Sequence, residues 1–244
     1  MKVTVIGFWG GYPEEGEATS SYLIEKDNFK LLLDCGSAAL SQLPKYTDPY
    51  ELDAVILTHY HNDHIADIGV LQYFMLVQNG IRDSDKTLPI YGHGHDKEAF
   101  SRLNHDFTKG YMYDPDIPLD LGPFTITFLK TDHPVTCFAM RITDGQSTFV
   151  FTADSSYKDS FIPFSKKADL LIADCNFYDG QNGKKAGHMN SKECAVLARE
   201  ADVNTLVLSH HPHFGDRKNL VTQAEKYFRG NIFLASSGLE FYVG

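Results

Sequence analysis

Thr58-His59-Tyr60-His61-Asn62-Asp63-His64 is the stretch that decides the fold of this chain. It directly follows residues 53–57, a short apolar run whose composition predicts a buried strand. The stretch is therefore expected on a loop at the carboxyl end of a core strand, where open α/β sheets commonly hold their sites. Imidazole nitrogens and carboxylate oxygens are the ligands that zinc and similar divalent metals take. A surface loop that is rich in histidine by chance is the alternative, but such polar groups are costly to bury unless something binds them.

The composition of the chain is that of an ordinary globular protein. Its 244 residues are 43% hydrophobic and 22% charged, which suits one large domain or two small ones. The formal net charge of −10 argues against general nucleic-acid binding, because an acidic surface repels phosphates. No apolar run approaches the ~18 residues that would span a bilayer, so we expect no membrane association.

The cysteines and the N-terminal residues bear on the cellular compartment. Cys35, Cys137, Cys175 and Cys194 are far apart and form no Cys-x-x-Cys motif, which favours buried free thiols in a reducing compartment. The apolar part of residues 1–7 is too short for a signal peptide and predicts a first strand. We therefore expect a cytoplasmic protein.

The rest of the chain predicts strands and helices with no linker and no internal repeat. Residues 20–25 and 29–34 form a predicted hairpin around Asp27-Asn28, and apolar residues at helical spacing predict a helix over 65–78. Residues 110–123 are rich in proline and aspartate and predict an irregular, lid-like loop. Further strands are predicted at 2–7, 88–92, 124–129, 137–142, 148–151, 169–175, 204–208, 232–234 and 240–243, and further helices at 97–104, 192–200 and 220–228. Asp144-Gly145 forms the turn between two of these strands, and Ser191 or Asn190 caps the helix at 192–200. We expect a single domain over residues 1–244.

Several predicted strands end in side chains that bind metals. The set comprises His59, His61, Asp63, His64, His133, Asp154 and His210. Seven ligands are too many for one tetrahedral zinc and suit two adjacent metals bridged by an aspartate. In this arrangement His59, His61 and His133 hold one metal, Asp63, His64 and His210 hold the other, and Asp154 lies between them.

Such a pair of metals predicts hydrolytic chemistry. Two metals roughly 3.5–4 Å apart lower the pKa of a bridging water and polarise the scissile oxygen, so a hydroxide becomes the nucleophile. Asp63 is the candidate to orient the water and take its proton. The leaving oxygen also needs a proton, and His188 is the candidate donor because imidazole titrates near working pH. A helix-capping role is the alternative for His188.

Other polar positions leave two interpretations open. Asp34 ends a predicted strand before a glycine, where it can orient a neighbouring histidine or simply close a turn. The glycines of loop 8–13 can approach a ligand closely or form a plain turn. We expect His93, His95 and His105 to be loop or surface histidines without a role in the site.

The stretch 58–64 resembles the HxHxDH signature of the metallo-β-lactamase superfamily. The loop with Gly11 and Pro13, the pair Ser20-Ser21, the strand end 33–36, His133, and the segments 152–155 and 208–210 follow in the family's order over nearly the whole chain. The resemblance implies an α+β fold, the αβ/βα sandwich, with two mixed β-sheets packed face to face and helices on both outer faces. It also implies a dinuclear metal site on one edge, with Zn²⁺ as the usual metal and Mn²⁺ or iron as alternatives. The family's strand-Ser/Thr-His pattern favours His210 over His211 as the ligand.

Within the superfamily the chain most resembles the ribonuclease Z-like branch and its phosphodiesterase relatives. The resemblance rests on Gly187-His188-Met189, followed by a short predicted helix and Ser209-His210. It implies that His188 assists leaving-group departure, as the corresponding histidine does in that branch. Ribonuclease Z carries a long arm that grips tRNA between its third metal histidine and its bridging aspartate, whereas residues 134–153 suffice only for a hairpin. We therefore expect a small phosphodiester or nucleotide-like substrate.

Other functions are weighed against this one. A lactonase or thioesterase of the same fold is the alternative, and a tRNA 3′-end endonuclease is less favoured. An oxygen-reducing diiron protein is disfavoured, because that branch usually has a carboxylate where His61 stands. A non-enzymatic binding or scaffold protein is disfavoured because every ligand position is filled. Relatives are often homodimers, so a homodimer is one possibility, and the sequence leaves the oligomeric state open.

Overall fold

The computed structural model describes residues 1–244, and they divide into two compact units. The N-terminal unit comprises Lys2–Asp114 and Ser236–Phe241, and the C-terminal unit comprises Pro115–Ala235 together with Met1 and Tyr242–Gly244. Each unit is built on one mixed sheet of seven strands. None of the helices has the length and apolar character that crossing a membrane requires. The expectation of one domain over residues 1–244 stays a prediction.

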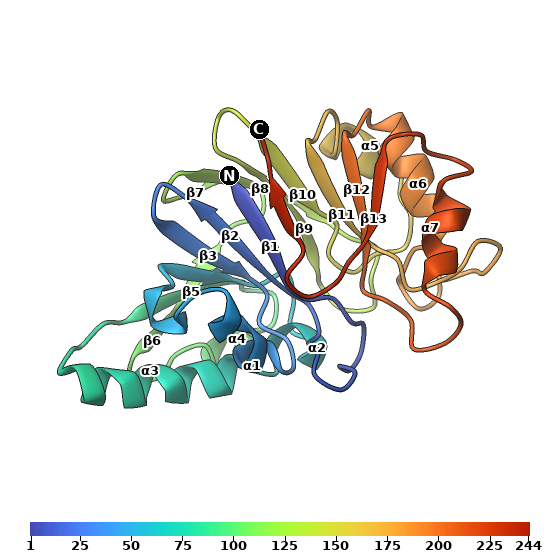
Figure 1. The fold of residues 1–244 in the computed structure, drawn as a ribbon. Coiled ribbons are helices and arrows are strands. Elements are labelled where there is room, and N and C mark those ends of the chain that lie inside the picture. The colour runs from blue at the N-terminus through green and yellow to red at the C-terminus, as the bar shows by residue number, and fades with distance from the viewer. The chain divides into compact units, whose positions relative to one another are not determined.

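The sheet of the N-terminal unit combines an antiparallel and a parallel part. Its strands are β1 (Lys2–Gly7), β2 (Ser21–Lys26), β3 (Phe29–Leu33), β4 (Ala54–Ile56), β5 (Leu88–His93), β6 (Thr108–Tyr113) and β14 (Glu240–Tyr242). They follow the order β14-β1-β2-β3-β4-β5-β6 (Figure 1). Strands β1, β2 and β3 pair antiparallel, and β3 to β6 pair parallel. The predicted hairpin is confirmed, and its turn residues Asp27 and Asn28 have left-handed φ angles that these residue types tolerate.

The helices of the N-terminal unit cover one face of this sheet. They are α1 (Ala39–Gln42), α2 (Asn62–Ile65), α3 (Ile68–Arg82) and α4 (Lys97–Ser101), with two 3₁₀ turns, η1 (Leu43–Lys45) and η2 (Pro49–Glu51). Along α3, Ile68, Leu71 and Met75 are buried in one apolar cluster with residues of the strands, such as Val55 and Ile90. The predicted helix over 65–78 is therefore real, but it begins at Ile68 because the shorter α2 precedes it.

The sheet of the C-terminal unit is mixed in the same way. Its strands are β7 (Leu119–Leu121), β8 (Phe124–Lys130), β9 (Phe138–Thr143), β10 (Thr148–Phe151), β11 (Leu170–Asp174), β12 (Thr205–Ser209) and β13 (Asn231–Leu234). They follow the order β13-β12-β11-β10-β9-β8-β7. Strands β10 to β13 pair parallel, and β7 to β10 pair antiparallel. The carboxyl ends of the parallel strands therefore meet at one edge of the sheet.

The predicted lid-like loop over 110–123 is wrong. Strand β6 continues to Tyr113 because it pairs with β5, and β7 pairs with β8. Pro115 and Pro118 fall between the two strands, where no ladder hydrogen bond is needed from their nitrogens. Pairing with other strands therefore overrides the local proline signal.

The helices of the C-terminal unit are α5 (Phe161–Phe164), α6 (Ser191–Glu200) and α7 (Lys218–Ala224). Their apolar residues share one buried cluster with alternate residues of β9 to β12, and Figure 1 shows α5 in gold, α6 in orange and α7 in red-orange along that sheet. Asn190 is the N-cap of α6 and forms a capping box with Glu193, which settles the choice between Asn190 and Ser191. All four cysteines are buried and free, as predicted.

Candidate metal centre

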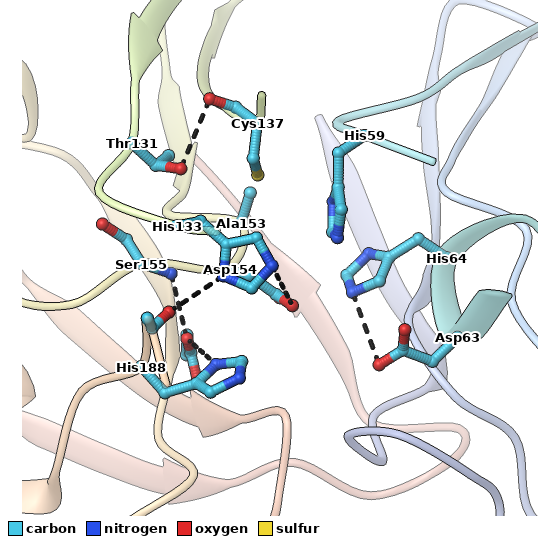
Figure 2. A network of polar contacts seen from close by, with 12 residues as sticks. His59, Asp63, His64, Thr131, His133, Cys137, Ala153, Asp154, Ser155 and His188 are labelled. Carbon is cyan, nitrogen blue, oxygen red and sulfur yellow. Dashed lines mark hydrogen bonds and ion pairs between the residues drawn. The ribbon is translucent and has the colours of Figure 1, made fainter. Parts of the chain in front are cut away.

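The motif 58–64 runs from the end of β4 into α2 and brings its polar side chains close to one another. His61 is the extended N-cap of α2, and the first turn of this helix buries Asp63 and His64. The His59 ring lies 4.8 Å from the His61 ring and 4.1 Å from the His64 ring, measured between centroids. His64 Nε2 lies 3.8 Å from Asp63 Oδ2, and Figure 2 shows this pair with His59. The N-terminal unit therefore gathers all four predicted ligands of the motif.

Asp34 is the buried anchor of this cluster. Its Oδ2 accepts a hydrogen bond from His64 Nδ1 at 2.7 Å, and its Oδ1 accepts one from the Thr58 amide at 2.8 Å. The Thr58 hydroxyl donates to the same carboxylate at 2.9 Å, so its oxygen can accept from His59 Nδ1, which lies 3.0 Å away. Burial raises the pKa of Asp34, and its contacts with His64 and Thr58 oppose that shift in part. Of the two roles predicted for Asp34, the structure shows the orienting one.

Two loops of the N-terminal unit hold the motif from outside. The Gly11 amide donates to Asp63 Oδ2 at 2.7 Å, so loop 8–13 contacts the site and is more than a plain turn. The Cys35 amide donates to His64 O at 2.8 Å. A Cβ at Gly36 would lie 2.1 Å from Asp63 O, so only glycine allows this approach of the two segments.

The C-terminal unit gathers the remaining predicted ligands. His133 follows β8, Asp154 follows β10 and His210 follows β12, and the side chains of all three are buried. Asp154 Oδ2 lies 3.4 Å from His210 Nε2 and 3.8 Å from His133 Nε2, and Figure 2 shows the pair of His133 and Asp154. The ends of three strands therefore bring these three side chains to one place.

The backbone at these strand ends is strained. Asp34, Ala153 and His210 have φ angles of 57°, 52° and 53°, in the left-handed region. Each such residue other than glycine costs about 1–3 kcal/mol, and such residues concentrate at functional sites. One of the three is His210 itself. Ala153 directly precedes Asp154, and Asp34 carries the carboxylate that binds His64. The fold therefore maintains unfavourable backbone where it aims ligand-type side chains.

His188 lies beside the cluster of the C-terminal unit, on the loop between β11 and α6. Its Nδ1 donates to Asp174 Oδ2 at 2.8 Å. Its ring lies 4.9 Å from the His210 ring and 5.3 Å from the His133 ring. Burial disfavours the protonated form of His188, but the Asp174 carboxylate outweighs burial and raises the pKa. His133 Nδ1 donates to the Gly187 carbonyl at 3.1 Å, which ties this loop to the cluster.

Asp174 is the functional residue that sequence analysis missed. It is the last residue of β11 and is buried, so its sequence context is that of a core strand. The available signal was the one that identified Asp154, a carboxylate at the carboxyl end of a buried strand. The atoms of Asp154, Asp174, His188 and His210 that could bind a metal all lie within 4.8 Å of one another.

Two neighbouring histidines after β12 have different environments. His211 Nε2 donates to Leu208 O at 2.7 Å, and burial lowers the pKa of His211 to about 3. His211 is therefore a neutral packing residue, whereas His210 Nε2 faces Asp154. The geometry favours His210, the residue that the family pattern also favours.

His93, His95 and His105 were expected to be loop or surface histidines, and this expectation is wrong for His93. His93 is 1% exposed, because β5 extends to this residue and pairs it with Tyr113 of β6. His95 and His105 are exposed, as expected.

The donor set fits divalent metals. In His59, His64 and His133, Nδ1 is bound to Thr58, Asp34 and Gly187, respectively, so Nε2 is the nitrogen that these rings present. The nitrogen–oxygen separations of 3.4–3.8 Å are longer than a good hydrogen bond. Two ligands of one ion, each bound at 2.0–2.1 Å, lie about 3.4 Å apart in tetrahedral geometry. Hydrogen bonds from the other ring nitrogen are the usual support of metal-binding histidines.

Comparison with known proteins identifies close relatives. Residues 30–211 match the family model described as the Beta-lactamase superfamily domain. The probable metallo-hydrolase YhfI of Bacillus subtilis (strain 168) is 58% identical over 239 residues, which cover 98% of each chain. The crystal structure of YhfI, described as a metallo-beta-lactamase fold protein, matches with a TM-score of 0.98 and 56% identity over 100% of this chain and 99% of that one. The predicted fold class is therefore confirmed.

More distant matches also span the chain. A ribonuclease Z of Haloferax volcanii is 24% identical over 308 residues, which cover 100% of this chain and 95% of that protein. The crystal structure of a diphosphatase from the PhnP family matches with a TM-score of 0.78 and 16% identity, over 99% of this chain and 97% of that one. The second match shows a shared fold alone.

Proposed function

Because this chain belongs to the beta-lactamase superfamily and is a metallo-hydrolase of that fold, we propose that it is a dinuclear, zinc-dependent phosphodiesterase. The proposed substrate is a small phosphodiester or nucleotide-like ester. One observation carries the choice of phosphodiester: the buried Asp174 carboxylate holds His188 next to the rings of His133 and His210. A proton donor in that place serves a leaving oxygen.

The ligands predicted from the sequence would hold the metals in this proposal. His59, His61 and His133 would hold one metal, Asp63, His64 and His210 would hold the other, and Asp154 would be a ligand of both. When bound, two divalent metals lower the pKa of a water and polarise the phosphoryl oxygens. Imidazole and carboxylate donors suit Zn²⁺, and Mn²⁺ or iron accept the same set. The Gly11 amide fixes the Asp63 carboxylate, which we assign to orient the attacking water.

His188 supplies the proton of the leaving group. An alkoxide that leaves a phosphodiester is a strong base and departs faster when it is protonated. With Nδ1 of His188 bound to Asp174, the other ring nitrogen is the one that gives up the proton. A thiolate, with a pKa of about 8.5, leaves without such help. The pair of Asp174 and His188 therefore favours the phosphodiesterase over the thioesterase alternative.

The size of the proposed substrate follows from the chain between two predicted ligands. From His133 to Asp154 the chain forms only β9, β10 and their turn. A similar protein is named ribonuclease Z, but this hairpin offers no extended arm to grip a tRNA. With a net charge of −10, the protein is suited to one phosphodiester and poorly suited to a long polyanion.

The test is a parallel hydrolysis screen with the metal-loaded protein. We expect bis(p-nitrophenyl) phosphate to be cleaved, with activity lost on chelation and restored by zinc, while a lactone and a thioester react slowly. His188→Ala should lower kcat by roughly 10²- to 10⁴-fold for a phosphodiester with an alkyl leaving group. The loss should be much smaller with p-nitrophenolate, which leaves without a proton.

His105→Ala is the matched control, because His105 is an exposed histidine of the N-terminal unit. If the lactone or thioester is opened quickly and no phosphodiester is cleaved, the protein is a lactonase or thioesterase and the phosphodiesterase proposal is wrong. Equal losses in His188→Ala for alkyl and nitrophenyl leaving groups would remove His188 from the proton-donor role and leave the metal-dependent activity standing.

A further inference from the structure

Three aromatic rings adjoin His188 in the C-terminal unit. Phe177 and Tyr178 lie on the loop after β11, and Phe214 lies on the loop after β12. The Phe177 ring centroid lies 6.5 Å from that of His188 and 6.4 Å from that of Phe214, which in turn lies 5.7 Å from that of Tyr178. We refer to Phe177, Tyr178 and Phe214 as the aromatic ledge. The proton donor therefore borders a continuous row of rings.

The aromatic ledge is fixed by hydrogen bonds. The Tyr178 hydroxyl donates to the Phe214 carbonyl at 2.8 Å and joins the two loops. A Cβ at Gly215 would lie 2.6 Å from that hydroxyl, and φ at this glycine is +76°, so the position requires glycine. The Phe177 amide donates to Met189 O at 3.2 Å, and the Phe177 carbonyl accepts from the Ser191 amide at 3.0 Å. The Tyr178 side chain and the backbone that carries the two phenylalanines are therefore held in place.

The exposure of Phe214 is not explained by packing. Its side chain is 47% exposed, although the backbone around it is held in place. This large apolar ring is half in water and lies against Phe177, which adjoins His188, so it offers a surface for another planar group. Aromatic side chains serve as stacking platforms for nucleobases, because every base has a flat π-face.

We propose that the aromatic ledge binds the base of a nucleoside leaving group, so that the substrate is a phosphodiester of a nucleoside. This inference rests on the proposed function. Because His188 gives its proton to the leaving oxygen, the side chains that adjoin His188 face the leaving group rather than the part that keeps the phosphate.

Two esters that differ only in the base provide the test. Adenosine 5′-(methyl phosphate) and ribose 5′-(methyl phosphate) share the phosphodiester and the leaving oxygen, and the release of adenosine or ribose is measured by chromatography. The wild-type protein should prefer the adenosine ester. Phe214→Ala should lower kcat/KM for this ester by roughly 10- to 100-fold, the value of one base stacked on one aromatic ring. The ribose ester should be unaffected.

Two further variants separate stacking from structure. Phe214→Tyr keeps a ring and should keep the preference, and Phe233→Ala removes a phenylalanine of similar exposure (41%) from β13. Phe233→Ala should change neither ester. Thermal unfolding midpoints show whether Phe214→Ala keeps its fold. Equal loss on both esters, or no preference in the wild-type protein, would overturn the role of the aromatic ledge.

Calorimetric binding of adenosine distinguishes failure of this inference from failure of the proposed function. Suppose that no phosphodiester is cleaved, but adenosine binds to the wild-type protein and binds at least 10-fold more weakly to Phe214→Ala. The binding role of the aromatic ledge is then supported, and the proposed phosphodiesterase activity is contradicted. If phosphodiesters are cleaved but adenosine binds equally to both proteins, the phosphodiesterase activity is supported and the role of the aromatic ledge is contradicted. If adenosine does not bind at all, the ledge is overturned.

Discussion

Two buried carboxylates perform the same task on two histidines. Asp34 accepts from His64 Nδ1 at 2.7 Å, and Asp174 accepts from His188 Nδ1 at 2.8 Å. Each carboxylate fixes the tautomer and the orientation of its imidazole, so that Nε2 is the atom presented. The proposed roles then differ with position. His64 presents Nε2 beside Asp63 as a ligand, and His188 presents it as a proton donor beside the ledge.

Replacing Asp174 tests whether this orientation matters. Asp174→Asn should lower kcat by roughly 10- to 100-fold, as the loss of such supporting carboxylates commonly does. The loss should be larger for an alkyl than for a p-nitrophenyl leaving group, because only the former needs the proton from His188. A purely structural role would lower both equally. Steady-state kinetics on the two esters checks this prediction.

Asp169→Asn is the control for that measurement. Asp169 directly precedes β11, the strand that Asp174 ends, and it accepts from the Thr148 amide at 2.9 Å, away from His188. Its replacement should leave the ratio of the two activities unchanged. A similar ratio change in both variants would show that the strand as a whole, rather than the Asp174 carboxylate, sets the behaviour of His188.

What the sequence could predict at this scale depended on local context. An apolar run precedes each of His133, Asp154 and His210, so the local sequence predicts a polar side chain at the end of a core strand. Asp174 has the same context, yet its role depends on His188, which is fourteen positions away and reaches it only through the loop before α6. His93 was misplaced because its burial comes from pairing with β6, which no local pattern reveals.

At the scale of elements, the sequence predicted every strand except β6 and β7, and it predicted the longer helices but missed the four-residue helices α1, α2 and α5. The hairpins succeeded because their turns carry residues that accept left-handed backbone, as at Asp27 and Asn28. The region 110–123 failed because proline is a local signal, whereas β6 and β7 exist through pairing with other strands. The left-handed φ angles at Ala153 and His210 were equally hidden, since neither residue type requires them.

The turn between β9 and β10 yields a prediction about acid stability. Asp144 Oδ1 accepts from the Ser147 amide at 2.7 Å and the Gln146 amide at 3.0 Å. Burial alone would raise the pKa of Asp144, but these bonds outweigh it and hold the pKa well below its usual range. A carboxylate with a depressed folded pKa stabilises above its unfolded pKa of about 3.9, and this stability is lost as pH falls through the folded pKa.

Asp144→Asn should therefore lower the free energy of unfolding by about 1.5–3 kcal/mol at pH 7, the range for hydrogen bonds to charged groups. The difference from the wild-type protein should stay constant down to about pH 5 and shrink below about pH 4. Urea unfolding at several pH values measures it. Asp27→Asn, in the exposed turn between β2 and β3, is the matched control. A difference that persists unchanged at pH 3 would contradict the assignment.

At the scale of the whole molecule, the predicted ligands are divided between the two units. The N-terminal unit contributes His59, His61, Asp63 and His64, and the C-terminal unit contributes His133, Asp154 and His210. Metals that bind only the folded chain add their binding free energy to its stability, so bound zinc should be visible in unfolding as well as in activity.

Removal of metal should therefore lower the thermal unfolding midpoint. At free zinc a thousand times its Kd, one bound ion adds about 4 kcal/mol. Each kcal/mol shifts the midpoint of a chain of this size by about 2–4 °C, so chelation should cost about 10 °C or more. Asp154→Ala, which removes the proposed bridge, should bind fewer than two zinc ions and lose most of that shift, while His105→Ala keeps both. Identical midpoints with and without zinc, together with less than one bound ion per chain, would contradict a metal centre built from these residues.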